Sequence, residues 1–141
     1  SEIVMQPQPQ KCYYCTINQA LFHMLLMNLL ANGIRHNEND CPRITITFSQ
    51  TKKYVSICFA DNGIGFDKSQ STKIFQKFFQ IERADSHHVG GTGLGLHMVE
   101  QVVRYHKGKI TAQSDGVGKG AQFTLSLPRQ TPTLSGTTGS K

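Results

Sequence analysis

The 141-residue sequence lacks an apolar run long enough to cross a membrane. Its longest nearly apolar stretch, Ala20 to Ala31, is interrupted by His23 and Asn28, whereas a membrane span needs about 20 apolar residues. A secretory signal is also missing, because Ser1 to Gln10 is polar and contains two prolines. We therefore expect a soluble chain that makes no contact with a membrane.

A disulfide framework is not indicated by the number or the spacing of the cysteines. The four cysteines include one C-x-x-C pair, Cys12 and Cys15, but no second pair follows at the spacing of a zinc site. Cys41 and His23 could complete a metal site with this pair. Free thiols in a reducing compartment are the simpler interpretation.

Acidic residues are few relative to basic ones. Fifteen Lys and Arg against nine Asp and Glu give a formal net charge of +6, which suits an anionic partner such as a nucleotide, a nucleic acid or an acidic protein surface. The basic residues are scattered, and no basic run exceeds Lys52-Lys53. We therefore do not expect a nucleic acid to be the partner.

Periodicity predicts one α+β domain over residues 12–128. A helix is expected from Asn18, its N-cap, to about His36, because the leucines between them recur on one face. A second helix is expected from about Leu94 to Tyr105, ended by Gly108. The expected strands are 12–17, 44–48, 55–59, 109–113 and 122–127, and a short third helix is expected at 71–79. Together these elements predict a two-layer α/β sandwich, a mixed sheet of about five strands with three helices on one face, followed by a flexible C-terminal tail over residues 129–141.

Two asparagines and an arginine share a polar face of the first predicted helix. Asn28 and Asn32 are one turn apart, and Arg35 follows about one turn later. A carboxamide oxygen is a hard ligand that suits Mg²⁺ bound to phosphates, and the arginine could reach the same phosphates. A solvated helix surface would explain the same pattern, so both interpretations stand at this point.

A glycine-containing turn follows the strand expected at 55–59. In Asp61-Asn-Gly-Ile-Gly65 the aspartate leaves the strand end, where it can accept a hydrogen bond. Gly63 and Gly65 would let a flat ligand approach the backbone. The same D-x-G-x-G pattern is also frequent in ordinary turns.

The densest glycine cluster lies immediately before the second long helix. Gly90 to Leu96 contains four glycines in seven residues. Backbone N–H groups at a helix N-terminus bind phosphate, aided by the helix dipole. The cluster is neither a P-loop nor a dinucleotide-binding G-x-G-x-x-G motif after an early strand.

The order of these motifs is more specific than any one of them. The asparagine pair is followed by the Asp61 turn, by Phe75-x-x-Phe78, by the glycine cluster and by Gly118-x-Gly120-x-x-Phe123. In this order and spacing, over residues 12–128, they resemble the catalytic, ATP-binding domain of two-component sensor histidine kinases. That family is one branch of the GHKL superfamily, with the Hsp90 chaperone, gyrase B and MutL ATPases. The resemblance implies a Bergerat-type ATP-binding fold, with ATP held between the helices and a lid over about residues 80–92.

The resemblance also implies a role for each matching residue. Asp61 would accept a hydrogen bond from the adenine amino group, and Gly63 and Gly65 would give the base room. Asn32, assisted by Asn28, would hold Mg²⁺ on the triphosphate. Further nucleotide contacts are implied for a cation, for two phenylalanines that anchor the lid and for the glycine cluster: Arg35, Phe75, Phe78, Gly91, Thr92, Gly93, Leu94, Gly95 and Leu96.

The sequence departs from the family pattern mainly in the lid. Gln80 stands where many relatives have arginine, and His87 stands where one subgroup has a second arginine. Arg83 is the nearest replacement cation, and we interpret His87-His88 as lid residues rather than a metal pair. None of the six histidines is followed by Asp or Glu, the usual sign of a phosphoacceptor histidine, so no catalytic residue is assigned within this chain.

The resemblance implies that the chain is the catalytic domain of a protein-histidine kinase. We expect this domain to lie in the cytoplasm, in a parent protein that can be membrane-anchored. It would bind Mg²⁺ and ATP and donate the γ-phosphate to a histidine on a separate dimerisation domain of the same parent, which then serves a response regulator. Residues 1–11 would be the linker from that missing helical domain, and the isolated chain would not phosphorylate itself. One alternative is an anti-sigma-factor serine kinase, which is disfavoured because position 28 is not Glu and the Phe75–Phe78 motif is present. A second alternative is a nucleotide-sensing or interaction module whose catalysis is weakened by the missing lid arginines.

Overall fold

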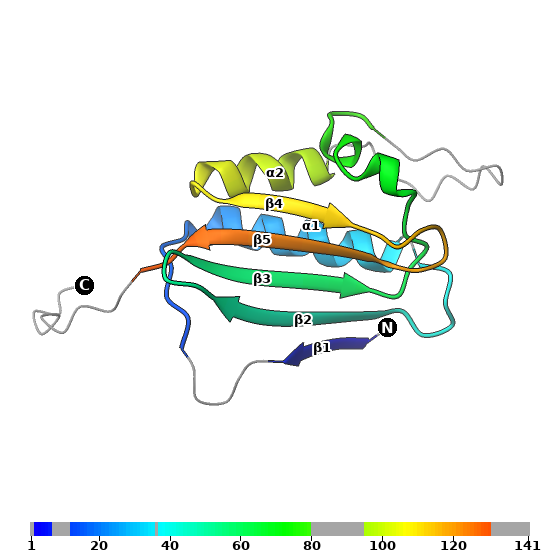
Figure 1. Cartoon of the computed structure of the whole chain (residues 1–141), viewed down its shortest axis with the longest axis horizontal. Helices are drawn as coiled ribbons and strands as arrows, with labels where there is room; N and C mark the ends of the chain where they lie inside the picture. Colours follow the sequence, from blue (N-terminus) through cyan, green and yellow to red (C-terminus); the bar gives the residue numbers. More distant parts are fainter. Residues whose placement is uncertain (1, 7–11, 36, 80–94, 131–141) are drawn as a thin grey trace, which may run out of the picture.

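A two-layer sandwich is seen in the computed structural model of the chain, which describes residues 2–6, 12–35, 37–79 and 95–130 (Figure 1). One layer is a five-stranded sheet, and helices pack against one of its faces. The strand order is β1 (Glu2–Gln6), β2 (Arg43–Gln50), β3 (Tyr54–Asp61), β5 (Ala121–Pro128) and β4 (Lys109–Gln113). β1 pairs with β2 in parallel and all other pairs are antiparallel. The predicted mixed α+β sheet is therefore confirmed.

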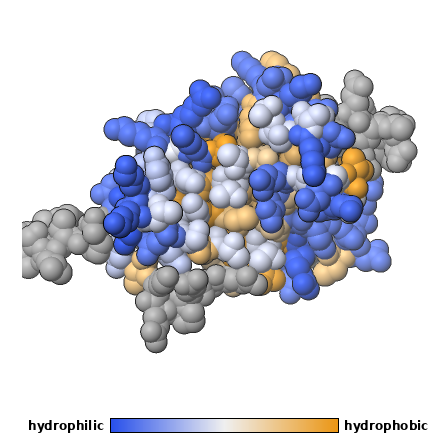
Figure 2. Space-filling view, viewed as in Figure 1, coloured by the Kyte–Doolittle hydropathy of each residue, from blue (hydrophilic) through white to orange (hydrophobic). Residues whose placement is uncertain are grey.

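The hydrophobic core lies between the sheet and the two α-helices, α1 (Gln19–Arg35) and α2 (Gly95–Tyr105). Strict alternation along the strands sends one set of apolar side chains toward the helices. The buried residues of this core include Leu25, Leu29, Ile44, Ile46, Ile57, Phe59, Val99, Val102, Val103, Phe123, Leu125 and Leu127. The alternate positions, such as Thr45, Ser56 and Ser126, lie on the other face, which Figure 2 shows as a pale, weakly polar surface in the middle of the view. None of the helices among the described residues is long and apolar enough to span a bilayer.

The ends of both helices are set by local hydrogen bonds. Asn18 caps α1 as predicted, because its Oδ1 accepts the N–H of Leu21 at 3.0 Å. After α2 the backbone becomes left-handed at Lys107, with φ 62°. The sequence analysis expected Gly108 to end this helix. Gly108 donates its N–H to the carbonyl of Val103 at 2.9 Å. It must be glycine because a Cβ there would collide with the carbonyl oxygen of Ser126.

The short helix expected at 71–79 is corrected to two 3₁₀ turns, η1 (Lys68–Gln70) and η2 (Lys73–Phe75). Ile74 and Phe75, adjacent in sequence, are both buried in the core. The backbone then becomes extended at Gln76 and left-handed at Phe78, with φ 65°. A left-handed residue cannot belong to a right-handed helix, so the helix cannot continue.

The N-terminal expectations are also corrected. Glu2–Gln6, placed in a linker by the sequence analysis, form β1, with Ile3 beside Ile44 and Met5 beside Ile46. Residues 12–17 form no strand. Tyr13 instead stacks on Phe48, with ring centroids 5.6 Å apart. Of the expected tail, residues 129 and 130 have no regular structure, and the rest lies outside the described residues.

Candidate functional site

Asp61 ends β3 in the middle of the sheet, and two backbone groups hold its side chain. Its Oδ1 accepts the N–H of Gly63 at 2.8 Å and the N–H of Ala121 at 3.2 Å. Burial raises the pKa of this carboxyl above its usual value, and the two N–H groups oppose that rise. Because both backbone bonds go to Oδ1, Oδ2 is the oxygen that remains for a ligand.

Gly65 is needed for internal packing. Its φ is +63°, and a Cβ there would lie 2.5 Å from the carbonyl oxygen of Gly120 and 2.6 Å from Oγ of Ser114. Gly63 is buried, and its carbonyl accepts the N–H of Gly120 at 2.9 Å. The sequence analysis assigned both glycines to making room for a base. In the structure, Gly65 makes room for the turn between β4 and β5.

Asn28 connects α1 to the beginning of α2. Its Nδ2 donates to the carbonyl of Met24 at 2.8 Å, which directs Oδ1 away from its own helix. This Oδ1 lies 3.1 Å from where a Cβ on Gly95 would be, so it faces the N-terminus of α2. An oxygen held beside a helix N-terminus, in a field that favours phosphate, fits the role predicted for Asn28.

Asn32 lies on the same helix, one turn nearer to Asp61. The adjacent Gly33 allows α1 to approach the sheet, since a Cβ on Gly33 would be 2.9 Å from Ile44 and 3.5 Å from the Cβ of Asp61. Asn32 is half-buried, and its side chain makes no hydrogen bond within the described part of the chain. Two carboxamides that can each present an oxygen fit a Mg²⁺ ion that completes its shell with phosphates and water.

Arg35 and the beginning of α2 complete the described part of the site. Arg35 is exposed in the last turn of α1 and forms no ion pair with another described residue. Gly95 is the first residue of α2, and Leu96 packs against the core. The helix predicted after the glycine cluster is therefore confirmed. The remaining predicted residues, which are Gly91, Thr92, Gly93, Leu94 and the lid positions Gln80, Arg83 and His87, lie outside the described residues.

The two predicted lid phenylalanines behave differently. Phe75 is buried and meets Phe123 edge-on, with centroids 6.4 Å apart. Phe78 is 65% exposed and contacts Lys77 rather than the core. Phe79 packs against the core instead. Of the expected pair, Phe75 is thus part of the core and Phe78 is not, and their role in anchoring the lid stays a prediction.

The sequence analysis missed two polar residues that hold the loop 61–66 in place. Oδ1 of Asn62 accepts the N–H of Arg43 at 2.8 Å and the Nδ2–H of Asn37 at 2.6 Å, so Asn62 ties the segment between α1 and β2 to the end of β3. Ser114 is buried, and its Oγ accepts the N–H of Phe66 at 3.1 Å. No pattern in the sequence indicated the hydrogen-bond partners of Asn62 or those of Ser114.

The two cysteines of the C-x-x-C pair lie in different surroundings. Cys12 bonds to Tyr14, which raises the pKa of that phenol, whereas Cys15 packs against the core and burial raises its thiol pKa. All four cysteines are free thiols. Within the described ranges, no group of three or more His, Cys, Asp or Glu side chains could hold a metal.

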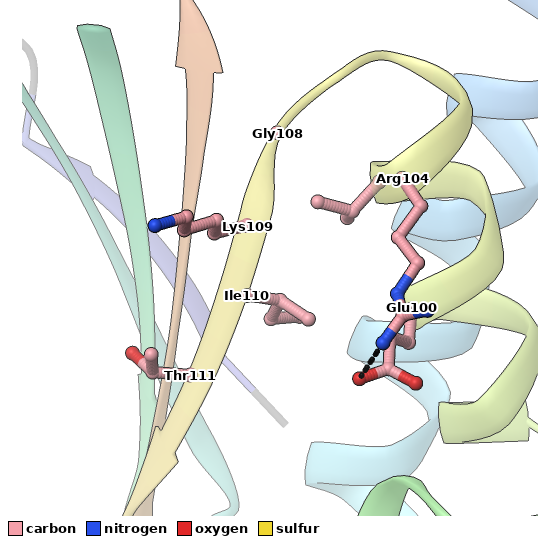
Figure 3. Close-up of a pocket in the computed structure, with 7 residues that line it drawn as sticks. Glu100, Arg104, Gly108, Lys109, Ile110 and Thr111 are labelled. Atoms are coloured by element: carbon pink, nitrogen blue, oxygen red, sulfur yellow. Dashed lines mark ion pairs between the residues drawn. The ribbon is translucent and has the colours of Figure 1, made fainter.

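A groove of about 210 Å³ lies between α2 and the edge strand β4. Figure 3 shows Glu100 and Arg104 of α2 paired along its rim, 3.8 Å apart, with Ile110 of β4 pointing toward α2. None of the residues predicted to bind a nucleotide lines this groove. It lies toward the end of the sheet away from Asp61, because Lys109 pairs with Ser126 while Asp61 pairs with Ala121.

Comparisons with known proteins agree on one family. A family model described as "Histidine kinase-, DNA gyrase B-, and HSP90-like ATPase" matches residues 17–131. The chain is 35% identical to the sensor histidine kinase RppB of Synechocystis sp. over 82% of this chain and 25% of that protein. It is 31% identical to the sensor histidine kinase WalK of Bacillus subtilis over 85% of this chain and 20% of that protein. The chain thus spans about a quarter or less of the length of these curated relatives.

Solved structures show the same fold at lower identity. The mycobacterial sensor histidine kinase MprB superimposes with a TM-score of 0.76 at 19% identity, over 93% of this chain and 83% of that one. The catalytic domain of histidine kinase ThkA gives 0.74 at 22% identity, over 91% and 80%. Full-length ShkA, solved in complex with AMPPNP, gives 0.76 at 22% identity, over 94% of this chain and 26% of that one.

Proposed function

Because the chain belongs to the histidine kinase-, DNA gyrase B- and HSP90-like ATPase family, we propose that it binds Mg²⁺ and ATP at the Asp61 site and donates the γ-phosphate to a histidine on another domain. Sensor histidine kinases are its relatives, and it is similar to their ATP-binding catalytic domain. The acceptor would be the dimerisation domain of the same parent protein, and a response regulator would take the phosphate next. The reaction would run in the cytoplasm, where ATP is available.

The position of Asp61 carries this proposal. A half-buried carboxylate whose Oδ1 is already bound by two backbone N–H groups keeps Oδ2 for one further donor. The adenine amino group is such a donor, and guanine has a carbonyl oxygen at the same ring position. Burial makes the bond stronger than it would be in water, so this carboxylate would select adenine.

The phosphates would extend from the base along α1 toward α2. Asn32 and Asn28 lie along that path and end beside the N-terminus of α2. When bound, Mg²⁺ neutralises charge on the phosphates. The carboxamides hold that cation, the N-terminus of α2 attracts the anionic oxygens, and Arg35 is free to contact them. Catalysis by such a site consists of positioning and charge stabilisation, since the nucleophile comes from outside.

Titration calorimetry with ATP, with and without Mg²⁺, followed by phosphotransfer to the parent's helical domain, tests the proposal. We expect tighter ATP binding in the presence of Mg²⁺ and an acid-labile, base-stable phosphohistidine on the added domain. Binding of ATP without transfer to that domain would indicate a nucleotide-sensing module. Absence of ATP binding would contradict the proposal altogether.

A further inference from the structure

The turn between β4 and β5, residues 114–121, packs directly on the loop that carries Asp61, residues 61–66. Gly118 donates its N–H to the carbonyl of Ile64 at 2.6 Å, and Gly120 donates to the carbonyl of Gly63 at 2.9 Å. The N–H of Ala121 reaches Asp61 itself. The two loops are more than 40 residues apart in the sequence, yet they form one hydrogen-bonded unit.

Ser114 lies at the centre of this unit. It is the one buried polar side chain among the described residues, 8% exposed. Its Oγ accepts the N–H of Phe66 at 3.1 Å and that of Gly116 at 3.2 Å, and its proton is donated to the carbonyl of Gly120 at 2.7 Å. One donor and two acceptors are the full capacity of a hydroxyl, and they join both loops.

The surrounding backbone leaves little freedom for this arrangement to change. A Cβ on Gly65 would lie 2.6 Å from Oγ of Ser114, and a Cβ on Gly120 would collide with the carbonyl oxygen of Asp61. The two loops are therefore in direct contact on either side of the hydroxyl. Any movement of the turn is transmitted to the N–H groups of Gly63 and Ala121, which orient the carboxylate.

We propose that Ser114 is a positioning residue for recognition of the nucleotide base: its hydroxyl locks the 114–121 turn onto the 61–66 loop and so fixes the direction in which Asp61 offers Oδ2. This inference rests on the proposed function, because it assigns Asp61 to the base. Ser114 itself touches no ligand in this role. It acts on adenine only through the backbone that holds Asp61.

Removal of the hydroxyl has a specific consequence. Ser114→Ala leaves the buried N–H of Phe66 without its partner, which is costly enough for the loop to shift. The bonds from Gly63 and Ala121 to Asp61 then lengthen. These bonds favour the ionised carboxylate against burial, so the pKa of Asp61 rises further. The pH below which ATP binding is lost should therefore move upward.

The experiment measures ATP and GTP binding by calorimetry over a pH series, for the wild-type chain and three variants. Ser114→Ala should bind ATP about tenfold more weakly, with a smaller change for GTP, so the preference for ATP falls. Ser114→Thr keeps the hydroxyl and should restore the preference. Ser126→Ala is the matched control, because the hydroxyl of Ser126 lies 3.1 Å from that of Ser56, on the face of the sheet away from the helices. This variant should behave like wild type.

The preference ratio measured at one pH does not depend on the fraction of folded protein, so lower stability alone does not alter it. The pH profile is therefore compared only over the pH range in which the variant stays folded. If Ser114→Ala has a lower melting temperature but keeps the wild-type ratio of ATP to GTP affinity and the wild-type pH profile, the inference is overturned. The proposed function is left intact by that result. If Ser114→Ala does not fold, we use Ser114→Cys, whose thiol is a weak donor and which should show a reduced preference for ATP over GTP. An unchanged preference in Ser114→Cys would also overturn the inference. A wild-type chain that binds no ATP would overturn the proposed function, and this inference with it.

Discussion

The replacement Asp61→Asn tests the site most directly, because the two side chains have nearly the same shape. The N–H groups of Gly63 and Ala121 both need an acceptor and occupy Oδ1. The introduced carboxamide must therefore keep its oxygen there and place its NH₂ group where Oδ2 was. That NH₂ group would face the adenine amino group, so two donors would meet.

The expected loss follows from the bond removed. A hydrogen bond to a charged group contributes about 1.5–3 kcal/mol, which corresponds to a tenfold to hundredfold weaker affinity for ATP. Inosine triphosphate has a carbonyl oxygen in place of the amino group, and the new NH₂ group can donate to it. The preference for ATP over inosine triphosphate should therefore fall sharply or invert in Asp61→Asn.

Stability of the ligand-free chain should change in the opposite direction. The folded pKa of Asp61 is raised above its usual 3.8, so the native state binds a proton more tightly than the unfolded state. The stability linked to this proton is present at acid pH and is lost as the pH rises through the folded pKa. At neutral pH the ionised side chain destabilises the fold, and Asp61→Asn removes that penalty while keeping the acceptor.

Two measurements check these expectations together. Calorimetry with ATP and inosine triphosphate gives the change in base preference, and thermal denaturation without nucleotide gives the change in stability. We expect weaker ATP binding with an equal or higher melting temperature. Unchanged affinity for ATP would refute the assignment of Asp61 to the base, and a lower melting temperature at neutral pH would refute the argument from its pKa.

Three further predictions concern the metal, the turn and the chemistry. Asn32→Ala should abolish the Mg²⁺ dependence of ATP binding but leave adenosine binding nearly intact, by calorimetry; an equal loss for adenosine would make Asn32 a structural residue. Gly65→Ala should lower the free energy of unfolding in urea by more than about 2 kcal/mol, because its Cβ would meet backbone oxygen. Gly118→Ala, also at positive φ but facing open space, should cost only about 1–2 kcal/mol, and equal effects would contradict the packing argument. The purified chain incubated with labelled ATP should release negligible phosphate and carry no label; robust turnover that Asn32→Ala abolishes would favour an ATPase.

The elements predicted best from the sequence are those whose signals are local. The helix from Asn18 and the strands around Ile44 and Phe59 were placed within a few residues, because a cap and a strict alternation lie within each segment. β1 was missed because its apolar run is three residues long and its partner, β2, begins about 40 residues later. No property of residues 2–6 alone distinguishes an edge strand from a linker.

The candidate site divides in the same way. Asp61, Asn28 and Asn32 were predicted because their motifs occur in one order along the chain, and their binding roles stay predictions. Gly65 was predicted to make room for a base, which stays a prediction, and the structure adds a packing reason that the sequence did not indicate, since its neighbours are atoms of residues about 50 positions later. Ser114 was missed because a single serine after a strand carries no sequence signal of its own. Its role depends on one hydrogen bond to Phe66, 48 residues away in the sequence, and on two within its own turn.

The arrangement of Asn28 and the described carboxylates gives a reason why this domain would transfer the γ-phosphate to a partner rather than to water. Direct hydrolysis needs a base that removes a proton from water, and in the ATPases that the sequence resembles a glutamate one turn before the metal-binding asparagine does this. Here that position is Asn28, whose amide cannot take a proton and whose Nδ2 donates a hydrogen bond to the carbonyl of Met24. Among the described residues, the nearby carboxylates do not replace it: Asp61 is held by backbone N–H groups at the base end of the site, and Glu100 pairs with Arg104 beside the distant groove. The proposed site therefore has groups that would bind and orient a triphosphate, whereas neither Asp61 nor Glu100 is placed to activate water, so γ-phosphate transfer would depend on a nucleophile that another domain brings.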